Sequence, residues 1–183
     1  EEVWRPFHTG VDAALRGHAG DARLFLDCHN MAQHGPSAYG DPGQVRPLLC
    51  IANFGDANGD FVVANGPLTA PAEFVRQAAR IAGELFGDLS LLQPDSQRPA
   101  PLVALNQPFV GGYILRHYCD AGYQRNIGSG YVGLMVEINR GLFVGDQSTR
   151  TPIQPPNQAA ITAVRQRLYR WVQAILPLLE QGR

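Results

Sequence analysis

The chain has 183 residues, a formal net charge of −1 and 45% hydrophobic residues. This length suits one compact domain over residues 1–183, and the balanced charge gives no electrostatic basis for a nucleic-acid or membrane partner. No apolar run reaches the length of a membrane span, and no signal peptide opens the sequence. The three cysteines indicate free thiols in a reducing compartment, with Cys28 and Cys50 buried in apolar runs, so we expect a cytoplasmic protein.

The first segment has the spacing of an amphipathic helix, with apolar residues at Val3, Phe7, Val11 and Leu15. An α/β domain more often opens with a strand. We therefore expect this sequence to be the C-terminal part of a longer domain.

The next segment, Leu24–Met31, opens with an apolar run broken by Asp27 and predicts a buried strand over residues 23–28 that delivers Asp27 and His29 to its C-terminal end. Open α/β sheets place ligand sites at such strand ends. Residues two apart in a strand point to the same side, so Asp27 either orients His29 or shares a metal ion with it. His29 is thus a candidate metal ligand or proton carrier. The alternative is a solvated histidine at the start of a loop, with Asp27 opening a turn.

A segment rich in glycine and proline follows over residues 30–47 and predicts a long loop. Long ordered loops are usually functional or mobile, and this one follows His29 directly, so it is a candidate lid. A second buried strand is predicted over residues 48–53. Thr69 is the expected N-cap of the next helix, which Gly87 ends.

The second half of the chain continues to alternate strands with helices. Strands are predicted over residues 102–106 and 131–138, and Asn157 is expected to cap a long terminal helix. The predicted fold is therefore an α/β fold of three layers, with a mixed, mostly parallel sheet and helices on both faces.

Glu137 is a second polar group near a predicted strand end, within the apolar run of residues 134–138. A carboxylate in such a run is paired, bound to a metal or shifted in pKa, because burial disfavours its charged form. A raised pKa suits a general base or acid near neutral pH. The alternative is a structural ion pair with Arg140 or Arg116. Taken together, Glu137 and His29 suggest a hydrolytic site.

The segment GGYILRHY contributes two further candidates. Arg116 offers a bidentate fork for a substrate carboxylate, and His117 could assist an oxyanion. The alternatives are an ion pair between Arg116 and an acid of the protein, and a surface role for His117. The sequence contains no GxSxG, P-loop or HExxH motif and no pair of CxxC motifs.

Five blocks of the sequence resemble the N-formylglutamate amidohydrolase family. They are WRPFH near the start, LFLDCHNM with Asn30 in place of the family's serine, RPLLCIANFGDANG, LNQPFVGGYILRHY and GLMVEINRGLFVGD. Because these blocks follow the family's order, they indicate homology over most of the chain.

The resemblance implies a fold similar to that of the zinc carboxypeptidases and a zinc-dependent reaction. It implies that His29 is a zinc ligand, that Glu137 is the general base and that Asp27 orients His29. Arg116 and Asn106 would bind the substrate. Family members begin with a further region bearing a histidine–small–glycine motif, which this sequence lacks. A catalytic zinc usually has three protein ligands, so we expect the others in a missing N-terminal segment or a partner chain.

The expected activity is hydrolysis of a small N-formyl or N-acyl amino acid. N-formylglutamate, whose cleavage belongs to histidine degradation, is the first candidate substrate. One alternative is a peptidoglycan amidase or carboxypeptidase-like hydrolase. The other is a non-catalytic binding subunit that keeps the fold.

Overall fold

The computed structural model describes residues 2–92, 94, 97–144, 155 and 157–180. Four strands form one sheet in the order β1-β4-β2-β3. They are β1 (Leu24–Met31), β2 (Leu49–Ala52), β3 (Val103–Leu105) and β4 (Val132–Asn139). The pairs β1–β4 and β2–β3 are parallel, whereas β2 and β4 run antiparallel. The predicted mixed, mostly parallel sheet is therefore confirmed.

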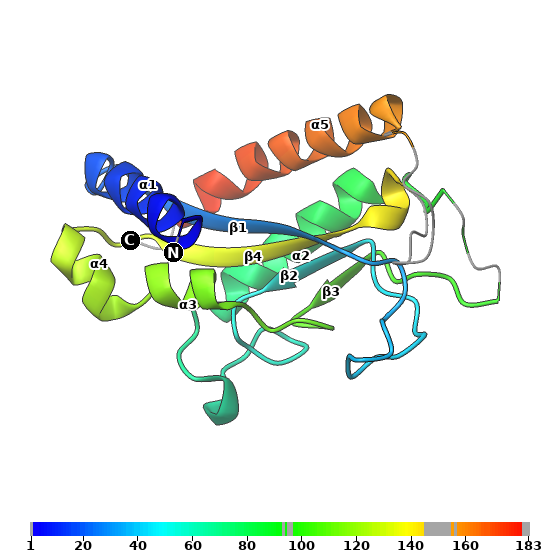
Figure 1. Ribbon diagram of the computed structural model, residues 1–183, viewed down its shortest axis with the longest axis horizontal. Coiled ribbons are helices and arrows are strands. Elements are labelled where there is room, and N and C mark those ends of the chain that lie inside the picture. Colours follow the sequence, from blue (N-terminus) through cyan, green and yellow to red (C-terminus); the bar gives the residue numbers. More distant parts are fainter. Residues whose placement is uncertain (1, 93, 95–96, 145–154, 156, 181–183) are drawn as a thin grey trace.

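Helices cover both faces of the sheet, which gives the predicted three layers (Figure 1). Two long helices, α2 (Ala72–Phe86) and α5 (Gln158–Ile175), lie on one face. The short helix α3 (Tyr113–Tyr118) packs on the other face, beside α4 (Ala121–Ile127) and α1 (Trp4–Gly17). Three 3₁₀ turns complete the described elements: η1 (Val63–Asn65), η2 (Arg140–Leu142) and η3 (Leu176–Leu179). The sequence did not predict α3 and α4, because six or seven residues are too few to show a helical period.

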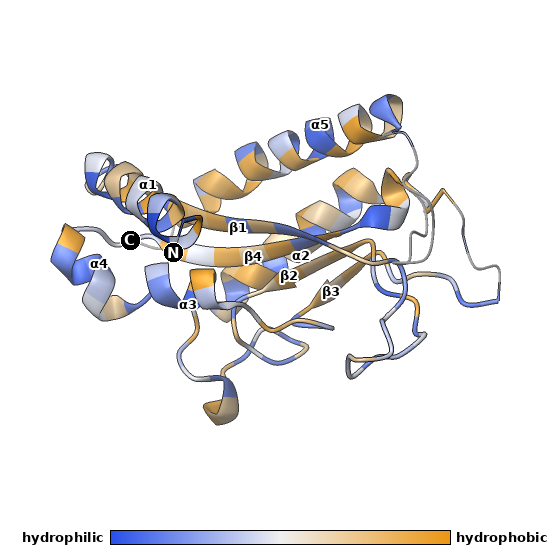
Figure 2. Cartoon of the chain, viewed as in Figure 1, coloured by the Kyte–Doolittle hydropathy of each residue, from blue (hydrophilic) through white to orange (hydrophobic). Residues whose placement is uncertain are grey.

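The main hydrophobic core lies between the sheet and the pair α2 and α5. Fully buried residues from both layers meet there, including Leu49, Ile51, Leu134 and Val136 of the strands. Trp171 of α5 fills the space between the helices, and its indole nitrogen donates a hydrogen bond of 2.8 Å to the carbonyl of Ala78. Figure 2 shows the corresponding hydrophobic bands on the strands and on the inner sides of both helices.

The start of α2 differs from the prediction. Thr69 was expected to cap it, but the hydroxyl of Thr69 donates to the carbonyl of Gly133 at 2.9 Å, and the helix begins at Ala72 after Pro71. Thr69 thus links the approach to α2 with the strand β4. Gly87 follows the last residue of the helix, as predicted.

The expected cap of the terminal helix is present. The side chain of Asn157 accepts a hydrogen bond of 3.1 Å from the amide of Ala160. Replacing Asn157 with alanine removes this acceptor, so we expect the free energy of unfolding to fall by about 1 kcal/mol. Chemical denaturation of both proteins measures the difference, and an unchanged midpoint would contradict the capping role.

The strand β1 is less buried than predicted. Among the described residues it pairs with β4 alone, so it forms an edge of the sheet. Asp27 and Met31 are buried, whereas Cys28, His29 and Asn30 are exposed. The prediction of a buried thiol is accordingly right for Cys50 and wrong for Cys28. In the part of the chain that is described, no helix is both long and apolar enough to cross a membrane.

The two faces of β4 have different neighbours. Leu134 and Val136 point into the core beneath α2 and α5. Side chains alternate along a strand, so Met135 and Glu137 point to the opposite face. Met135 packs there against Leu115 of α3. Glu137 therefore lies on the face that carries α3.

Candidate active site

The sheet brings Asp27, His29 and Glu137 to one face. In the parallel register of β1 and β4, His29 lies opposite Glu137 and Asp27 lies opposite Met135. Paired residues of neighbouring strands point to the same side, so the three polar side chains share the α3 face. A Cβ atom on Gly112, directly before α3, would lie 4.0 Å from Oδ2 of Asp27, in agreement with this orientation.

Asp27 and His29 form a hydrogen-bonded pair. Oδ1 of Asp27 lies 2.7 Å from Nε2 of His29; the carboxylate side chain is 6% exposed and the imidazole 41%. With Nε2 held by the carboxylate, Nδ1 is left for a ligand or a substrate. Asp27 lies within β1 and does not open a turn. The predicted role of Asp27, to orient the His29 ring, requires such a hydrogen bond between the two side chains.

Glu137 is a buried carboxylate. Burial raises its pKa, an effect that the positive charges of His29 and Arg46 oppose and the negative charge of Asp27 reinforces. Among the described residues Glu137 forms no ion pair, with neither Arg140 nor Arg116. Its Oε2 atom is buried without a hydrogen-bond partner, and the same holds for Oδ2 of Asp27. Buried polar atoms are nearly always satisfied, so two such oxygens on neighbouring strands indicate a place for a water molecule or a ligand.

Cys50 lies beside Glu137 in the sheet. The two residues are partners in the antiparallel register of β2 and β4. The thiol donates to the carbonyl of Phe109 at 3.4 Å, and burial raises the pKa of Cys50 to about 11. The thiol is therefore protonated at neutral pH and does not supply a thiolate nucleophile here.

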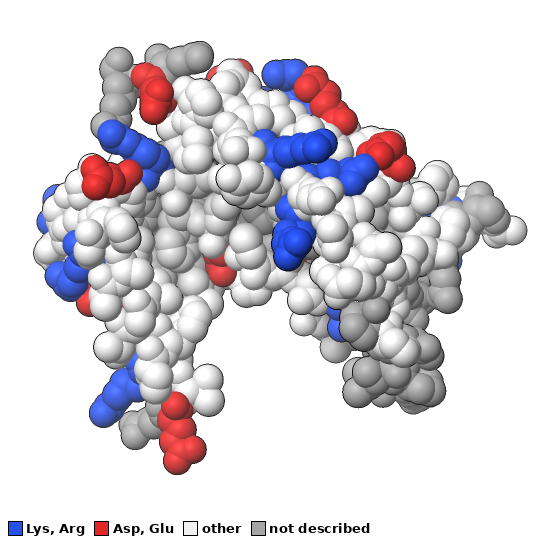
Figure 3. Space-filling model, turned by 90° about the horizontal axis from the view of Figure 1, so that it is seen from above, with Lys and Arg blue, Asp and Glu red and all other residues white. Residues whose placement is uncertain are grey.

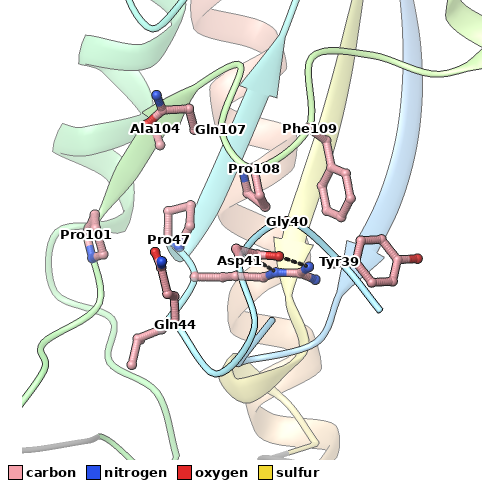
Figure 4. Close-up of a pocket in the computed structure, with 12 residues that line it drawn as sticks. Tyr39, Gly40, Asp41, Gln44, Pro47, Pro101, Ala104, Gln107, Pro108 and Phe109 are labelled. Carbon is pink, nitrogen blue, oxygen red and sulfur yellow. Dashed lines mark hydrogen bonds and ion pairs between the residues drawn. The ribbon is translucent and has the colours of Figure 1, made fainter. Parts of the chain in front are cut away.

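Arg46 is a buried cation next to this face. It is 3% exposed and forms two hydrogen bonds with Asp41, Nε to Oδ2 at 2.7 Å and Nη2 to Oδ1 at 3.0 Å. Its Cζ atom lies 4.9 Å from the centre of the Phe109 ring and 5.2 Å from that of Tyr39. The guanidinium also holds the pKa of Asp41 below its usual range. In Figure 4, dashed lines mark the ion pair that Asp41 forms with Arg46, and the rings of Tyr39 and Phe109 lie beside it.

Two cavities meet at these side chains. One, of about 300 Å³, is lined by Glu137, Arg140, Arg46, Tyr39 and Phe109, among others. The second, of about 710 Å³, shares Arg46, Tyr39 and Phe109 with the first. The loop was predicted over residues 30–47, but residues 30 and 31 belong to β1. The remaining loop contributes to both cavities, and its role as a lid stays a prediction. Seen from above, acidic and basic side chains are interspersed on the visible face of the molecule (Figure 3).

Arg116 and Asn106 lie outside the cavity that Glu137 lines. The guanidinium of Arg116 donates to the carbonyls of Asn65 and Pro67, at 2.7 Å for Pro67, and its Cζ lies 3.5 Å from the centre of the Phe54 ring. The structure thus assigns Arg116 a contact with the turn after η1. The substrate-binding role that the resemblance implies for it stays a prediction.

Asn106 is a buried member of a hydrogen-bond network. Its Oδ1 accepts from the backbone amide of Asn53 at 3.0 Å, and its Nδ2 donates to Oδ1 of Asn53 at 2.9 Å and to the carbonyl of Asp56 at 2.7 Å. These bonds hold the turn that follows β2. A contact between Asn106 and a substrate also stays a prediction.

His117 lies among aromatic rings and does not line the cavity of Glu137. It stacks on Tyr113, with ring centres 5.6 Å apart, and meets Tyr118 edge to face at 4.8 Å. His8 of α1 joins the same group through a contact of 2.6 Å between Nδ1 and the hydroxyl of Tyr118. These contacts attach α1 to α3 and favour a structural role for His117.

No pattern in the sequence pointed to Arg46, Asp41, Tyr39 or Phe109 as site residues. They lie in segments rich in glycine and proline, without a period that shows which side chains point inward. The absence of lysine also makes any single arginine less informative, because arginine then serves every basic position. The one usable signal was the length of the loop that follows His29.

The described residues do not form a complete zinc site. His29 offers an imidazole, and Asp27 and Glu137 each offer a buried oxygen without a partner. However, no group of three or more His, Cys, Asp or Glu side chains in the described part of the chain is arranged to hold a metal ion. The zinc implied by the resemblance therefore finds only a partial set of donors there.

These features define a class of protein. A buried carboxylate that lines a cavity lies opposite a carboxylate-held imidazole on the neighbouring strand, and hydrolases use such groups for acid–base chemistry. A family model described as N-formylglutamate amidohydrolase matches residues 1–144, and the chain belongs to the N-formylglutamate amidohydrolase family. Comparisons with curated proteins and with solved structures gave no match.

Proposed function

We propose that this protein hydrolyses the amide bond of an N-formyl or N-acyl amino acid, with N-formylglutamate as the first substrate to test. The observation that carries the proposal is the pair of buried carboxylate oxygens without partners on the neighbouring strands β1 and β4, those of Asp27 and Glu137. Glu137 also lines a cavity. Membership of the amidohydrolase family supports the same reaction.

In the proposed reaction, Glu137 is the general base. Its carboxylate accepts a proton from a water molecule as the water oxygen bonds to the formyl carbon. The bond between that carbon and the amide nitrogen then breaks, and the proton passes from Glu137 to the departing nitrogen. The products are formate and the free amino acid. His29, held through Nε2 by Asp27, keeps Nδ1 for a polar group of the substrate.

Zinc binding would require donors beyond those of the described residues. We expect any bound zinc to use His29, with further ligands from other residues or a partner chain. Elemental analysis of the purified protein and of its His29→Ala variant, before and after addition of zinc, tests this expectation. Equal zinc content in both proteins would remove His29 from the ligands.

The proposed function is tested by a substrate panel. Release of formate or acetate and of a primary amine is measured with N-formyl-L-glutamate, N-acetyl-L-glutamate and a muramyl dipeptide. Hydrolysis of an N-acyl amino acid supports the proposal, and cleavage of the peptidoglycan fragment alone would favour the amidase alternative. No turnover of any compound, with or without zinc, would overturn it.

The pH dependence of the rate follows from the environment of Glu137. A general base acts as the ionised carboxylate, and burial raises the pKa of this one. We therefore expect kcat/KM to fall as the pH drops through the raised pKa, which is a higher pH than an exposed glutamate would give. A rate that stays constant down to the pH at which exposed glutamates are protonated would contradict this assignment.

A non-catalytic binding subunit is the second candidate function. The incomplete set of metal donors in the described residues favours it. Such a protein would bind N-formyl-L-glutamate without releasing formate, so calorimetry combined with the formate assay separates the two candidates.

A further inference from the structure

We infer that Arg140 binds a carboxylate of the substrate. This inference rests on the proposed function and deepens it, because it states which substrates the site selects. The cavity beside Glu137 is lined by two arginines, Arg46 and Arg140. The two differ in how far their charge is already neutralised.

The positive charge of Arg46 is already neutralised by an ion pair with Asp41. Its guanidinium forms two hydrogen bonds with Asp41 and lies against the rings of Phe109 and Tyr39. Arg46 and Asp41 together contribute no net charge to the cavity. A substrate carboxylate would have to compete with an existing, largely buried partner.

Arg140 has no such partner in the part of the chain that the structure describes. It forms no ion pair with a described residue, and its Nε atom is buried without a hydrogen-bond acceptor. A guanidinium carries five N–H donors in a planar fork that matches a carboxylate. A buried donor of this kind on the wall of a cavity is the complement of an anionic ligand.

The backbone around Arg140 is held in place. The side chain of Asn139 accepts from the amide of Gly141 at 2.9 Å and donates to the carbonyls of Arg46 and Pro47 at 3.1 Å. Arg140 begins the turn η2, directly after β4, three positions beyond Glu137. The carboxylate anchor and the general base are thus fixed by one strand end, which sets their separation before a substrate arrives.

The electrostatics of the cavity require a free cation for an anionic substrate. Glu137 must be ionised to act as a base, and it would repel a substrate carboxylate in the same cavity. Arg140 offsets this repulsion and places the carboxylate away from Glu137. The site therefore favours acylated amino acids over neutral amides.

The test measures binding without turnover. N-formyl-L-glutamate is titrated by calorimetry into the Glu137→Gln protein and into the same protein with Arg140→Gln. Loss of a charge-assisted pair should raise Kd about 10- to 100-fold. The matched control is Arg80→Gln, which removes one positive charge from an exposed residue of α2 paired with Glu84. The control should leave Kd unchanged.

Two further ligands identify which carboxylate is bound. N-formyl-L-glutamine keeps the α-carboxylate alone, and the α-amide of N-formyl-L-glutamate keeps the side-chain carboxylate alone. The ligand whose affinity depends on Arg140 carries the recognised group. The Arg140→Lys variant keeps the positive charge but loses the planar fork of N–H donors, so it should bind with intermediate affinity. It replaces Arg140→Gln in the experiment if that variant does not fold.

The outcomes separate this inference from the proposed function. Equal Kd values for the proteins with and without Arg140 would overturn the inference even if the enzyme hydrolyses formylglutamate. Binding that depends on Arg140 without any hydrolysis by the unchanged protein would overturn the proposed function alone. Absence of binding to the Glu137→Gln protein would overturn the inference.

Discussion

Replacing Glu137 with glutamine is expected to lower kcat by about 10²- to 10⁴-fold, because the variant cannot take a proton from water. Glutamine has nearly the same shape as glutamate, so the cavity and the substrate contacts are preserved. KM should change much less than kcat. Initial rates of formate release from N-formyl-L-glutamate measure both constants.

The same substitution should not destabilise the fold. Burial raises the pKa of Glu137, so the folded state binds a proton more tightly than the unfolded state does. Stability from this group is present at low pH and is lost as the pH rises through the raised pKa. At neutral pH the charged side chain therefore costs folding free energy that glutamine does not. We expect the variant to melt at the same temperature or higher.

A matched control for this experiment is Glu84→Gln. Glu84 is exposed on α2, where it pairs with Arg80, on the far side of the sheet from the cavity. This variant loses the same charge and should keep full activity. Near-normal turnover by the Glu137→Gln protein would remove Glu137 from the mechanism, whatever the control shows.

Replacing Asp41 with asparagine should lower the free energy of unfolding by about 3 kcal/mol, because it leaves the buried charge of Arg46 without its partner. Arg46 is 3% exposed and Asp41 18% exposed, so water replaces the lost carboxylate poorly. The loop over residues 32–47 would lose the contact that fixes its turn. Denaturant unfolding of the two proteins gives the difference in free energy.

Two further variants serve as controls for this prediction. Asp88→Asn breaks an ion pair with Arg167 in which Asp88 is 67% exposed, so it should cost less than about 1 kcal/mol. Replacing Asp41 and Arg46 together with leucine and methionine removes both charges, and stability should then recover at least in part. Equal losses for Asp41→Asn and Asp88→Asn would show that the Arg46 pair is not effectively buried.

The sequence predicted those parts of the site that lie on strands. Asp27, His29 and Glu137 interrupt apolar runs, and alternation along a strand shows which neighbours share their face. The pairing of β1 with β4, which places His29 opposite Glu137, depends on the order of strands in the sheet. A single sequence carries no signal for that order.

Other parts of the site depend on contacts between distant segments. Asp41 and Arg46 meet within a loop, and Phe109 reaches them from another segment, so no local period marks them. Thr69 has the residue type of a helix cap, but a strand carbonyl competes for its hydroxyl. Arg116 has the chemistry of a substrate anchor, and nearby backbone carbonyls take up its donors. For Thr69 and Arg116, the hydrogen-bond partners are set by the tertiary fold, which no local pattern in the sequence shows.

The position of β1 at an edge of the described sheet makes the two halves of the site unequal in local stability. Asp27 and His29 are carried by a strand with one neighbour, whereas Glu137 is carried by β4, which lies between β1 and β2. An opening of β1 would separate the imidazole from the carboxylate base while the core beneath α2 and α5 stays folded. Amide hydrogens of β1 should therefore exchange with solvent sooner than those of β4. Heating should likewise abolish activity before it melts the core, so that the working temperature of the protein is set by one strand rather than by the domain.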